Sequence, residues 1–323
     1  MNRLAIALPL LLATCGGSPV LAAPALVMKN AIGQHAPAGT YGRITLINCT
    51  GCVVDGAEGV VLDPAPGASI NDQIVRVTGS KRAVVRNLSI IGKPAVAGVP
   101  QSSKVLDKTG NVIGLCTGEG IGVTGSDGAV IERNTIKCFH QGITFGASTD
   151  LSIIGNTVAG CRTSPISGGA RDRLTISDNV LAGGHAWRWG FTPGDHGDAI
   201  HVWTETPLVQ QLRISGNRFE QAGGTPILGI FLQAKVAGSR YTGANISGNS
   251  ITNSNTCGIC LYGVSGVAQG NRLIWNKAPT SRGIDKRDAP ALSLRAGVRD
   301  LTVSGTIGPV SRVAGLVNVT VLP

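Results

Sequence analysis

The heptapeptide TISDNVL, residues 175–181, decides the fold because variants of it recur along the chain. Each variant combines apolar residues with an asparagine at its fifth position. The six copies are VIERNTI (130–136), SIIGNTV (152–158), TISDNVL (175–181), RISGNRF (213–219), NISGNSI (245–251) and VAQGNRL (267–273). Their asparagines are Asn134, Asn156, Asn179, Asn217, Asn249 and Asn271, separated by 22, 23, 38, 32 and 22 residues. Asn87, 47 residues before Asn134, extends the pattern. This periodicity predicts a repeat of about 22 residues with two insertions.

A second recurring pattern is a short apolar strand ahead of each asparagine segment. It reads GIGV (120–123), GITF (142–145), AIHVW (199–203), GIFLQ (229–233) and GICLY (258–262). Two or three short strands per repeat, separated by Gly, Asn, Ser or Asp turns, cannot bury their apolar face alone. Stacking the repeats solves this, so we predict an all-β, single-stranded right-handed parallel β-helix. The asparagines then stack at one corner of the helix in a structural role.

These repeats resemble those of the right-handed parallel β-helix superfamily, which includes pectate lyases, polygalacturonases, alginate epimerases and phage tailspikes. The resemblance covers roughly residues 74–270 and implies a protein that acts on, or binds, a carbohydrate chain. We expect residues 24–72 to form capped N-terminal turns and residues 278–323 to form the last turns. Residues 23–323 are thus predicted to be one β-helix domain.

The N-terminus has the pattern of a signal peptide. Arg3 precedes an apolar run that ends in Val20-Leu21-Ala22, a small-residue cleavage signature, so residues 1–22 are excluded from the fold. Thr14 before Cys15 fits a lipoprotein processing site poorly. No later segment has 18 unbroken apolar residues, so no membrane span is predicted. We expect a secreted or periplasmic protein.

Composition and charge narrow the choice of partners. With 42% hydrophobic residues and a mean hydropathy of +0.20, the chain can bury a large core. Its formal net charge of +10 favours a polyanionic partner. For a secreted protein this indicates an acidic polysaccharide and not nucleic acid. A parallel rod is compatible with a monomer or with a homotrimer packed side by side.

The cysteines leave three possibilities open. Cys138 and Cys161 are one repeat apart, so they could stack on adjacent turns and form a disulfide. The pairs Cys49-x-x-Cys52 and Cys257-x-x-Cys260 together resemble a four-thiolate zinc site. A rod would separate these two pairs by many turns, so we favour buried cysteines acting as small apolar residues.

The stretch from His185 to Trp203 concentrates chemically active side chains. It holds three of the five histidines and three of the four tryptophans of the chain. We predict that it carries a site on a repetitive scaffold. The candidate catalytic residues are Arg188, Asp195, His196, Asp198 and His201, and Trp187, Trp189 and Trp203 are candidates for stacking on sugars. Asp195 and Asp198 could instead bind Ca²⁺, which prefers oxygen ligands.

Aligning the strands on their isoleucines predicts which residues face outwards. One equivalent position is occupied by Gly122, Thr144, Ser167, His201, Phe231 and Cys260. Side chains alternate along a strand, so the position two residues later also points out. It is occupied by Thr124, Gly146, Trp203, Gln233 and Tyr262. We therefore expect an outer patch of His201, Trp203, Phe231, Gln233 and Tyr262, flanked by insertions that carry residues 185–197 and Lys235, Arg240 and Tyr241.

Three functions fit this patch. A polysaccharide lyase would use His196 or His201 as the base, with Arg188, Lys235 or Arg240 neutralising the uronate carboxylate. A glycoside hydrolase would use Asp195 and Asp198 as its two carboxylic residues, with Glu205 farther along. A uronate epimerase or a non-catalytic binding protein would use the same groove. We favour the lyase because of the positive charge and the His and Arg content.

Family motifs do not decide between these functions. Gly197-Asp198-Ala199-Ile200 resembles a strand entry of polygalacturonase-like enzymes, but the Asp-Asp, Gly-His-Gly and Arg-Ile-Lys motifs of that group are absent. No Trp-Ile-Asp-His segment of the pectate lyase type occurs. His196-x-Asp198-x-Ile200 followed by Trp203 is most similar to a group of bacterial β-helix proteins presumed to process polysaccharides.

Overall fold

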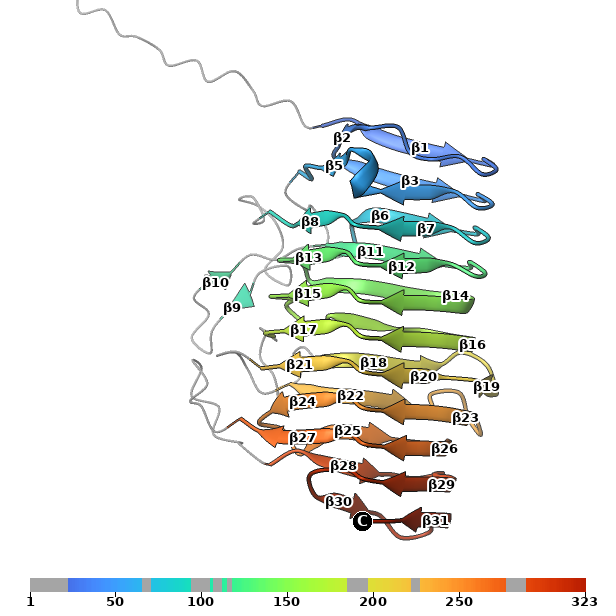
Figure 1. Cartoon of the computed structure of the whole chain (residues 1–323), viewed down its shortest axis with the longest axis vertical. Helices are drawn as coiled ribbons and strands as arrows, with labels where there is room; N and C mark the ends of the chain where they lie inside the picture. Colours follow the sequence, from blue (N-terminus) through green and yellow to red (C-terminus); the bar gives the residue numbers. More distant parts are fainter. Residues whose placement is uncertain are drawn as a thin grey trace, which may run out of the picture.

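The computed structural model describes residues 23–65, 71–93, 105–106, 112–114, 118–184, 197–221, 227–276 and 289–323. They form a rod of stacked turns that winds from β1 at one end to β31 at the other (Figure 1). The helical content of these residues is one 3-10 turn, η1 (Gly56–Glu58). No helix in this part of the chain is long and apolar enough to cross a membrane. The predicted signal peptide, residues 1–22, lies outside the described residues.

Successive strands of each turn lie on three faces of the rod. The first face consists of β1 (Ala25–Lys29), β3 (Arg43–Ile47), β6 (Gln73–Thr78), β11 (Glu119–Thr124), the first halves of β14 (Gln141–Ile154) and β16 (Ile166–Ser177), β18 (Asp198–Thr204), β22 (Leu228–Gln233), β25 (Cys257–Leu261), β28 (Ala291–Leu294) and β30 (Val310–Arg312). The second face consists of β4 (Val53–Asp55), β7 (Val84–Arg86), β12 (Val130–Glu132), the second halves of β14 and β16, β20 (Arg213–Ser215), β23 (Arg240–Ser247), β26 (Val264–Gln269), β29 (Arg299–Ser304) and β31 (Val317–Val321), with β19 (Leu208–Gln210) paired to β23.

The third face is a seven-stranded sheet. It consists of β8 (Ser89–Ile91), β13 (Thr135–Lys137), β15 (Thr157–Ala159), β17 (Val180–Ala182), β21 (Arg218–Glu220), β24 (Ser250–Asn253) and β27 (Arg272–Trp275). Neighbouring strands on all three faces pair in parallel. Two small pairs complete the structure: β2 (Gly39–Tyr41) with β5 (Val60–Leu62), and β9 (Val105–Leu106) with β10 (Val112–Gly114). The predicted right-handed parallel β-helix is confirmed.

The core is a set of apolar columns inside the rod. On the first face, one column consists of Ile121, Ile143, Ile166, Ile200, Ile230 and Ile259, and each member is at most 1% exposed. Stacking places each isoleucine directly on the next, which removes its β-branched side chain from water. Stacking begins at β1 and continues to β31, so the expected N-terminal and C-terminal turns are present and extend the repeat beyond residues 74–270.

The six repeat asparagines form a buried ladder, as predicted. From Asn156 onward, each Asn Oδ1 accepts hydrogen bonds from the backbone N and the Nδ2 of the preceding asparagine; between Asn156 and Asn179 these distances are 2.9 and 3.0 Å. The extension to Asn87 was wrong by one residue. Leu88 occupies the ladder position, and its backbone N donates to Asn134 Oδ1 at 3.1 Å. Asn87 has a positive φ and instead donates to Asp55.

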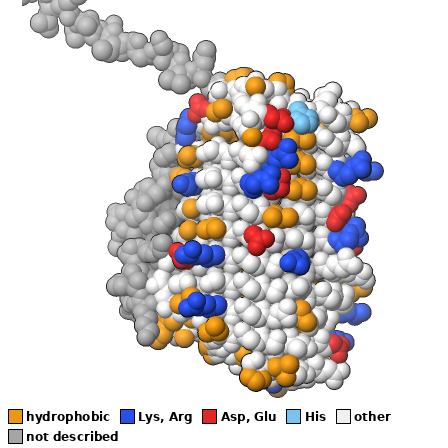
Figure 2. Space-filling view, viewed as in Figure 1, with side chains coloured by type: hydrophobic (Ala, Val, Ile, Leu, Met, Phe, Trp, Pro, Cys, Tyr) orange, Lys and Arg blue, Asp and Glu red, His pale blue; other side chains and the backbone are white. Residues whose placement is uncertain are grey.

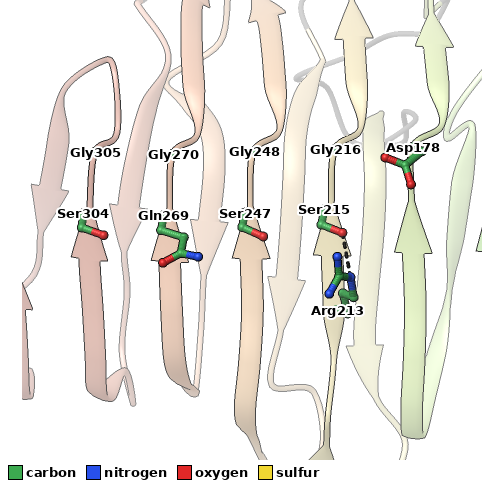
Figure 3. A pocket seen from close by; sticks show the side chains of 10 residues that line it. All are labelled: Asp178, Arg213, Ser215, Gly216, Ser247, Gly248, Gln269, Gly270, Ser304 and Gly305. Atoms are coloured by element: carbon green, nitrogen blue, oxygen red, sulfur yellow. Dashed lines mark hydrogen bonds between the residues drawn. The ribbon is translucent and has the colours of Figure 1, made fainter.

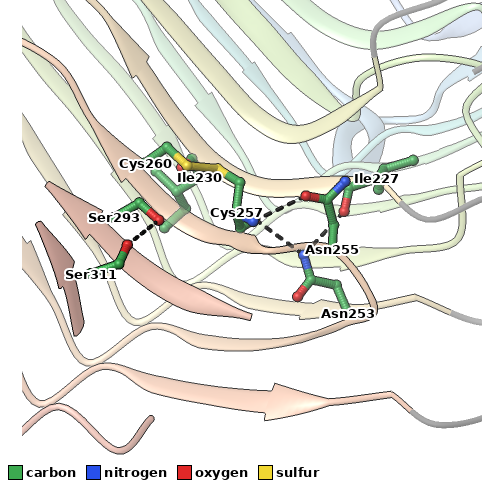
Figure 4. The surroundings of a disulfide bond; sticks show 8 residues. All are labelled: Ile227, Ile230, Asn253, Asn255, Cys257, Cys260, Ser293 and Ser311. Carbon is green, nitrogen blue, oxygen red and sulfur yellow. Dashed lines mark hydrogen bonds between the residues drawn. A yellow bond between two sulfur atoms is a disulfide. The ribbon is translucent and has the colours of Figure 1, made fainter. Parts of the chain in front are cut away.

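The cysteines correct two expectations. Cys138 and Cys161 remain thiols. Cys138 lies opposite Gly160 in the neighbouring turn, one residue before Cys161, so the two cysteines are out of register although their turns are adjacent. Burial, with a smaller contribution from Cys138, raises the pKa of Cys161 to about 12. Cys257 and Cys260 form a disulfide and are not simply apolar fillers (Figure 4).

Cys49 and Cys52 are buried in the core, as predicted for cysteines that act as small apolar residues. Both residues are fully buried thiols. The Sγ atoms of Cys49 and Cys52 donate to the backbone oxygens of Met28 and Ala31. Burial, together with the neighbouring Cys49, raises the pKa of Cys52 to about 11. Both groups therefore help to close the first turns of the rod.

Candidate functional site

The predicted outward column on the first face is confirmed. Strand pairing places Gly122, Thr144, Ser167, His201, Phe231 and Cys260 at successive positions of one column. The column two residues later places Trp203 beside Gln233. This register follows from the core, because moving a strand by one residue would turn its isoleucine outwards.

The aromatic side chains of the patch contact one another across three turns. The His201 ring lies 5.2 Å from the Trp203 ring and 4.9 Å from the Phe231 ring, measured between centroids. Phe231 in turn meets Tyr262 edge to face at 5.7 Å. All four side chains are partly exposed. Together with Gln233 and Lys235 they form what we call the aromatic patch, which runs along the axis of the rod.

Two of the three predicted cations are described, and they differ in position. Lys235 Nζ lies 5.1 Å from the centre of the Trp203 ring, within the range of a cation–π interaction. The exposed Arg240 begins β23, round the corner from the patch, and pairs there with Leu208. Tyr241, which was expected in the groove wall, is fully buried and its hydroxyl donates to Val202 O at 3.0 Å. Its burial raises its pKa.

Asp198 and His201 form an acid–imidazole pair at the start of β18. Asp198 Oδ2 lies 3.4 Å from His201 Nδ1. The Asp198 side chain is fully buried, whereas that of His201 is 20% exposed. The carboxylate is therefore placed to orient the ring and to favour a proton on Nδ1, which leaves Nε2, an atom that is itself buried in this structure, as the nitrogen that accepts a proton.

A second buried carboxylate on this face was not predicted from the sequence. Glu119 is 8% exposed, and its Oε2 accepts hydrogen bonds from Gln73 Nε2 at 2.8 Å and from Thr144 Oγ1 at 2.6 Å. It precedes Ile121 as Asp198 precedes Ile200, so alignment on the isoleucines would have revealed it. Glu119 and Asp198 are three turns apart in one column, which at about 4.8 Å per turn separates them by about 14 Å.

Glu205 covers the first face beside the aromatic patch. Its Oε2 accepts a hydrogen bond from Ala147 N at 2.5 Å and lies 3.4 Å from Arg171 Nε. Its Oε1 occupies the space above Gly169, where an added Cβ would lie only 2.2 Å away. Gly169 pairs with Trp203 in the neighbouring strand. The glycine therefore allows this carboxylate to lie across two turns.

The remaining site predictions fall in a loop that is not described. Trp187, Arg188, Trp189, Asp195 and His196 lie outside the described residues. Asp198 is thus the described member of the predicted Ca²⁺ pair. Within the described ranges, no group of three or more His, Cys, Asp or Glu is placed to hold a metal ion.

A shallow groove of about 530 Å³ lies elsewhere, where the strands of the second face end (Figure 3). Ser215, Ser247 and Ser304 line it, with a left-handed glycine after each of them. Arg213 Nε donates to Ser215 Oγ at 2.9 Å, so this cation is engaged within the groove. On the same side of the rod, Lys and Arg side chains are spread among acidic ones (Figure 2). None of the predicted site residues lines this groove.

The family described as right handed beta helix region matches residues 73–235, just over half of the chain. No curated protein sequence matches this chain. Among solved structures, the Dettilon tailspike protein aligns with a TM-score of 0.57 and 14% identity, over 93% of this chain and 60% of the tailspike. The chain therefore spans less than two thirds of that protein.

Two further solved structures are similar at lower scores. PfbA, a surface adhesin of Streptococcus pneumoniae, has a TM-score of 0.49 and 11% identity over 92% of this chain and 69% of its own. The alginate lyase from Paenibacillus sp. str. FPU-7 has a TM-score of 0.42 and 14% identity over 92% of this chain and 99% of the lyase. At 14% identity the likeness to the tailspike shows a shared fold alone, and the two lower-scoring structures carry no argument about this chain.

Proposed function

Because this chain belongs to the right-handed β-helix family, we propose that its first face cleaves an acidic, uronate-containing polysaccharide by β-elimination. The observation that carries the proposal is the pair formed by Asp198 and His201. A carboxylate that holds an imidazole in one tautomer makes the ring an effective general base. His201 would remove the proton from the carbon next to the uronate carboxylate. A C=C bond would then form as the glycosidic C–O bond breaks, and the leaving oxygen would take a proton from the protonated His201 or from water.

Lys235 supports an acidic substrate. Elimination beside a carboxylate builds negative charge that a cation must stabilise. Lys235 is held over Trp203, whose other neighbour is His201, so base and cation flank one aromatic ring. A sugar ring stacked on Trp203 would lie between them. The net charge of +10 adds long-range attraction for a polyanion.

Hydrolysis is less well supported by the described carboxylates. Inverting glycosidases separate their two carboxyl groups by roughly 6.5–9.5 Å, and retaining ones by about 5 Å. Asp198 and Glu119 are about 14 Å apart by strand spacing. The hydrolase alternative therefore depends on Asp195, which lies outside the described residues, or on Glu205, whose carboxylate is engaged by Ala147 N and lies beside Arg171.

The proposal also covers location and assembly. The basic start, apolar run and small-residue ending of residues 1–22 support export, so we place the protein in the periplasm or outside the cell. Its partner would be an acidic glycan and not nucleic acid, and it would act as a monomer or a homotrimer.

The test is the ultraviolet absorbance of unsaturated uronate ends when the full chain acts on a panel of acidic polysaccharides, with and without EDTA. We expect a rise in absorbance that the variant His201→Ala abolishes. Loss of the rise in EDTA would add a metal requirement. New reducing ends without a rise in absorbance would show hydrolysis instead of elimination. If neither signal is observed, an epimerase or a binding protein remains as the function.

A further inference from the structure

Ser167 differs from the other hydroxyl residues of its column. It pairs with His201 in the neighbouring strand and is 3% exposed. Its Oγ has no hydrogen-bond partner in the part of the chain that the structure describes. By contrast, Thr144 donates to Glu119, and Ser311 donates to Ser293. A buried hydroxyl without a partner is costly, so its retention calls for a functional reason.

The position of Ser167 supplies that reason. Paired residues on parallel strands are about 4.8 Å apart and point to the same side, so the serine hydroxyl and the imidazole are neighbours, with no hydrogen bond between them in this structure. Catalytic hydrogen bonds are often long or poorly aligned before a substrate binds. Asp198 lies against Nδ1 of the same ring at 3.4 Å. The order Asp198, His201, Ser167 is therefore that of orienting acid, base and nucleophile.

We propose that Ser167 is a catalytic nucleophile and that the first face removes O-acyl esters from a glycan. Ser167 Oγ attacks the ester carbonyl carbon while its proton passes to His201 Nε2. The ester C–O bond then breaks, and the sugar oxygen leaves with that proton as a free hydroxyl. Water attacks the acyl-serine and gives a proton to His201, which returns it to Ser167 as the carboxylic acid is released.

The surroundings of Ser167 favour a small, neutral acyl group. Gly169 follows two residues later on the same strand, about 7 Å away, and is covered by the Glu205 carboxylate. This negative charge disfavours an anionic acyl group, so an acetyl ester is the expected substrate. The inference shares the Asp198–His201 pair with the proposed lyase site but needs no elimination step.

The first experiment treats the full wild-type chain with a fluorophosphonate probe and locates the modified residue by peptide mass spectrometry. Acetate release is then measured from an acetylated polyuronate and from p-nitrophenyl acetate. The variant Ser167→Ala is compared with Ser293→Ala, which removes a 2% exposed hydroxyl from the same column four turns away. Thermal unfolding checks that both variants are folded, and uronate absorbance is recorded in parallel.

We expect the probe on Ser167 and at least a 1,000-fold lower acetate release in Ser167→Ala, with Ser293→Ala close to wild type. An unlabelled Ser167 in the wild-type chain, or acetate release within tenfold of wild type in Ser167→Ala, would overturn the inference. The wild-type labelling needs no variant, so a folding failure does not remove the test. Acetate release without uronate absorbance would refute the proposed lyase alone, and the reverse would refute the esterase alone.

Discussion

Asp198 Oδ2 lies 3.4 Å from His201 Nδ1, and Asp198 is fully buried while His201 reaches the surface. The two residues are three apart in β18, where a regular strand would place them on opposite faces, yet their side chains meet. A buried carboxylate is retained when its charge is used, because burying it without a partner would be costly. The pair is therefore the centre of the candidate site.

The first prediction concerns this pair. Asp198→Asn keeps the shape of the side chain but no longer favours a proton on Nδ1 of His201. We expect kcat for uronate elimination to fall about 10²- to 10⁴-fold with little change in KM. The control is Asp127→Asn, which removes an exposed carboxylate bonded to Thr149. Equal rates for the two variants would refute a role for Asp198 in orienting the base.

The second prediction concerns the aromatic patch. Tyr262→Ala and Phe231→Ala each remove a stacking surface, so we expect roughly 3- to 10-fold weaker binding of an acidic oligosaccharide by calorimetry. The two rings contact each other, so the double variant should lose less than the sum of the two free-energy changes. Trp275→Ala removes an exposed aromatic side chain from the third face and should leave binding unchanged.

The third prediction concerns the asparagine ladder. Asn179→Ala removes the oxygen that accepts from the backbone N and the Nδ2 of Asn156. Two buried donors lose their partner, so we expect the free energy of unfolding to fall by about 1–3 kcal/mol in urea titration. Asn318→Gly, at an exposed asparagine with a left-handed φ that donates to Asp300, should change this free energy by less than about 0.5 kcal/mol, because glycine tolerates that conformation. A smaller effect at Asn179 than at Asn318 would contradict a structural ladder.

The fourth prediction concerns pH and Asp55. Burial alone would raise the pKa of Asp55, but hydrogen bonds from Asn87, Ala57 N and Arg86 outweigh it and lower the pKa. A lowered folded-state pKa stabilises the fold above the ordinary carboxyl pKa of about 3.9, and this stabilisation is lost as the pH falls through the folded value.

Asp55→Asn should therefore destabilise the chain by about 1–3 kcal/mol at pH 6–8. The difference from wild type should shrink below about pH 4, as measured by urea unfolding across that range. If the stability difference between wild type and Asp55→Asn grows as the pH falls, folding does not lower the pKa of Asp55.

Much of the fold could be predicted because its information is local and repeated. Each turn has an isoleucine inside and an asparagine at one corner, and the stacking of turns makes each strand align with its equivalent in the next. The alignment of Ser167, His201 and Phe231 on the isoleucines therefore agrees with the strand pairing. Asn87 was the exception, since the ladder position of that turn is occupied by Leu88.

The sequence by itself determined the repeat, the register and the outward position of His201 and Trp203, because strand periodicity and the burial of isoleucine leave one consistent arrangement. The tertiary structure alone decided which side chains meet between turns. Glu205 reaches back over Gly169, and Glu119 accepts a hydrogen bond from Thr144. These contacts depend on turn conformations and side-chain rotamers across neighbouring turns, and no pattern within one repeat specifies them.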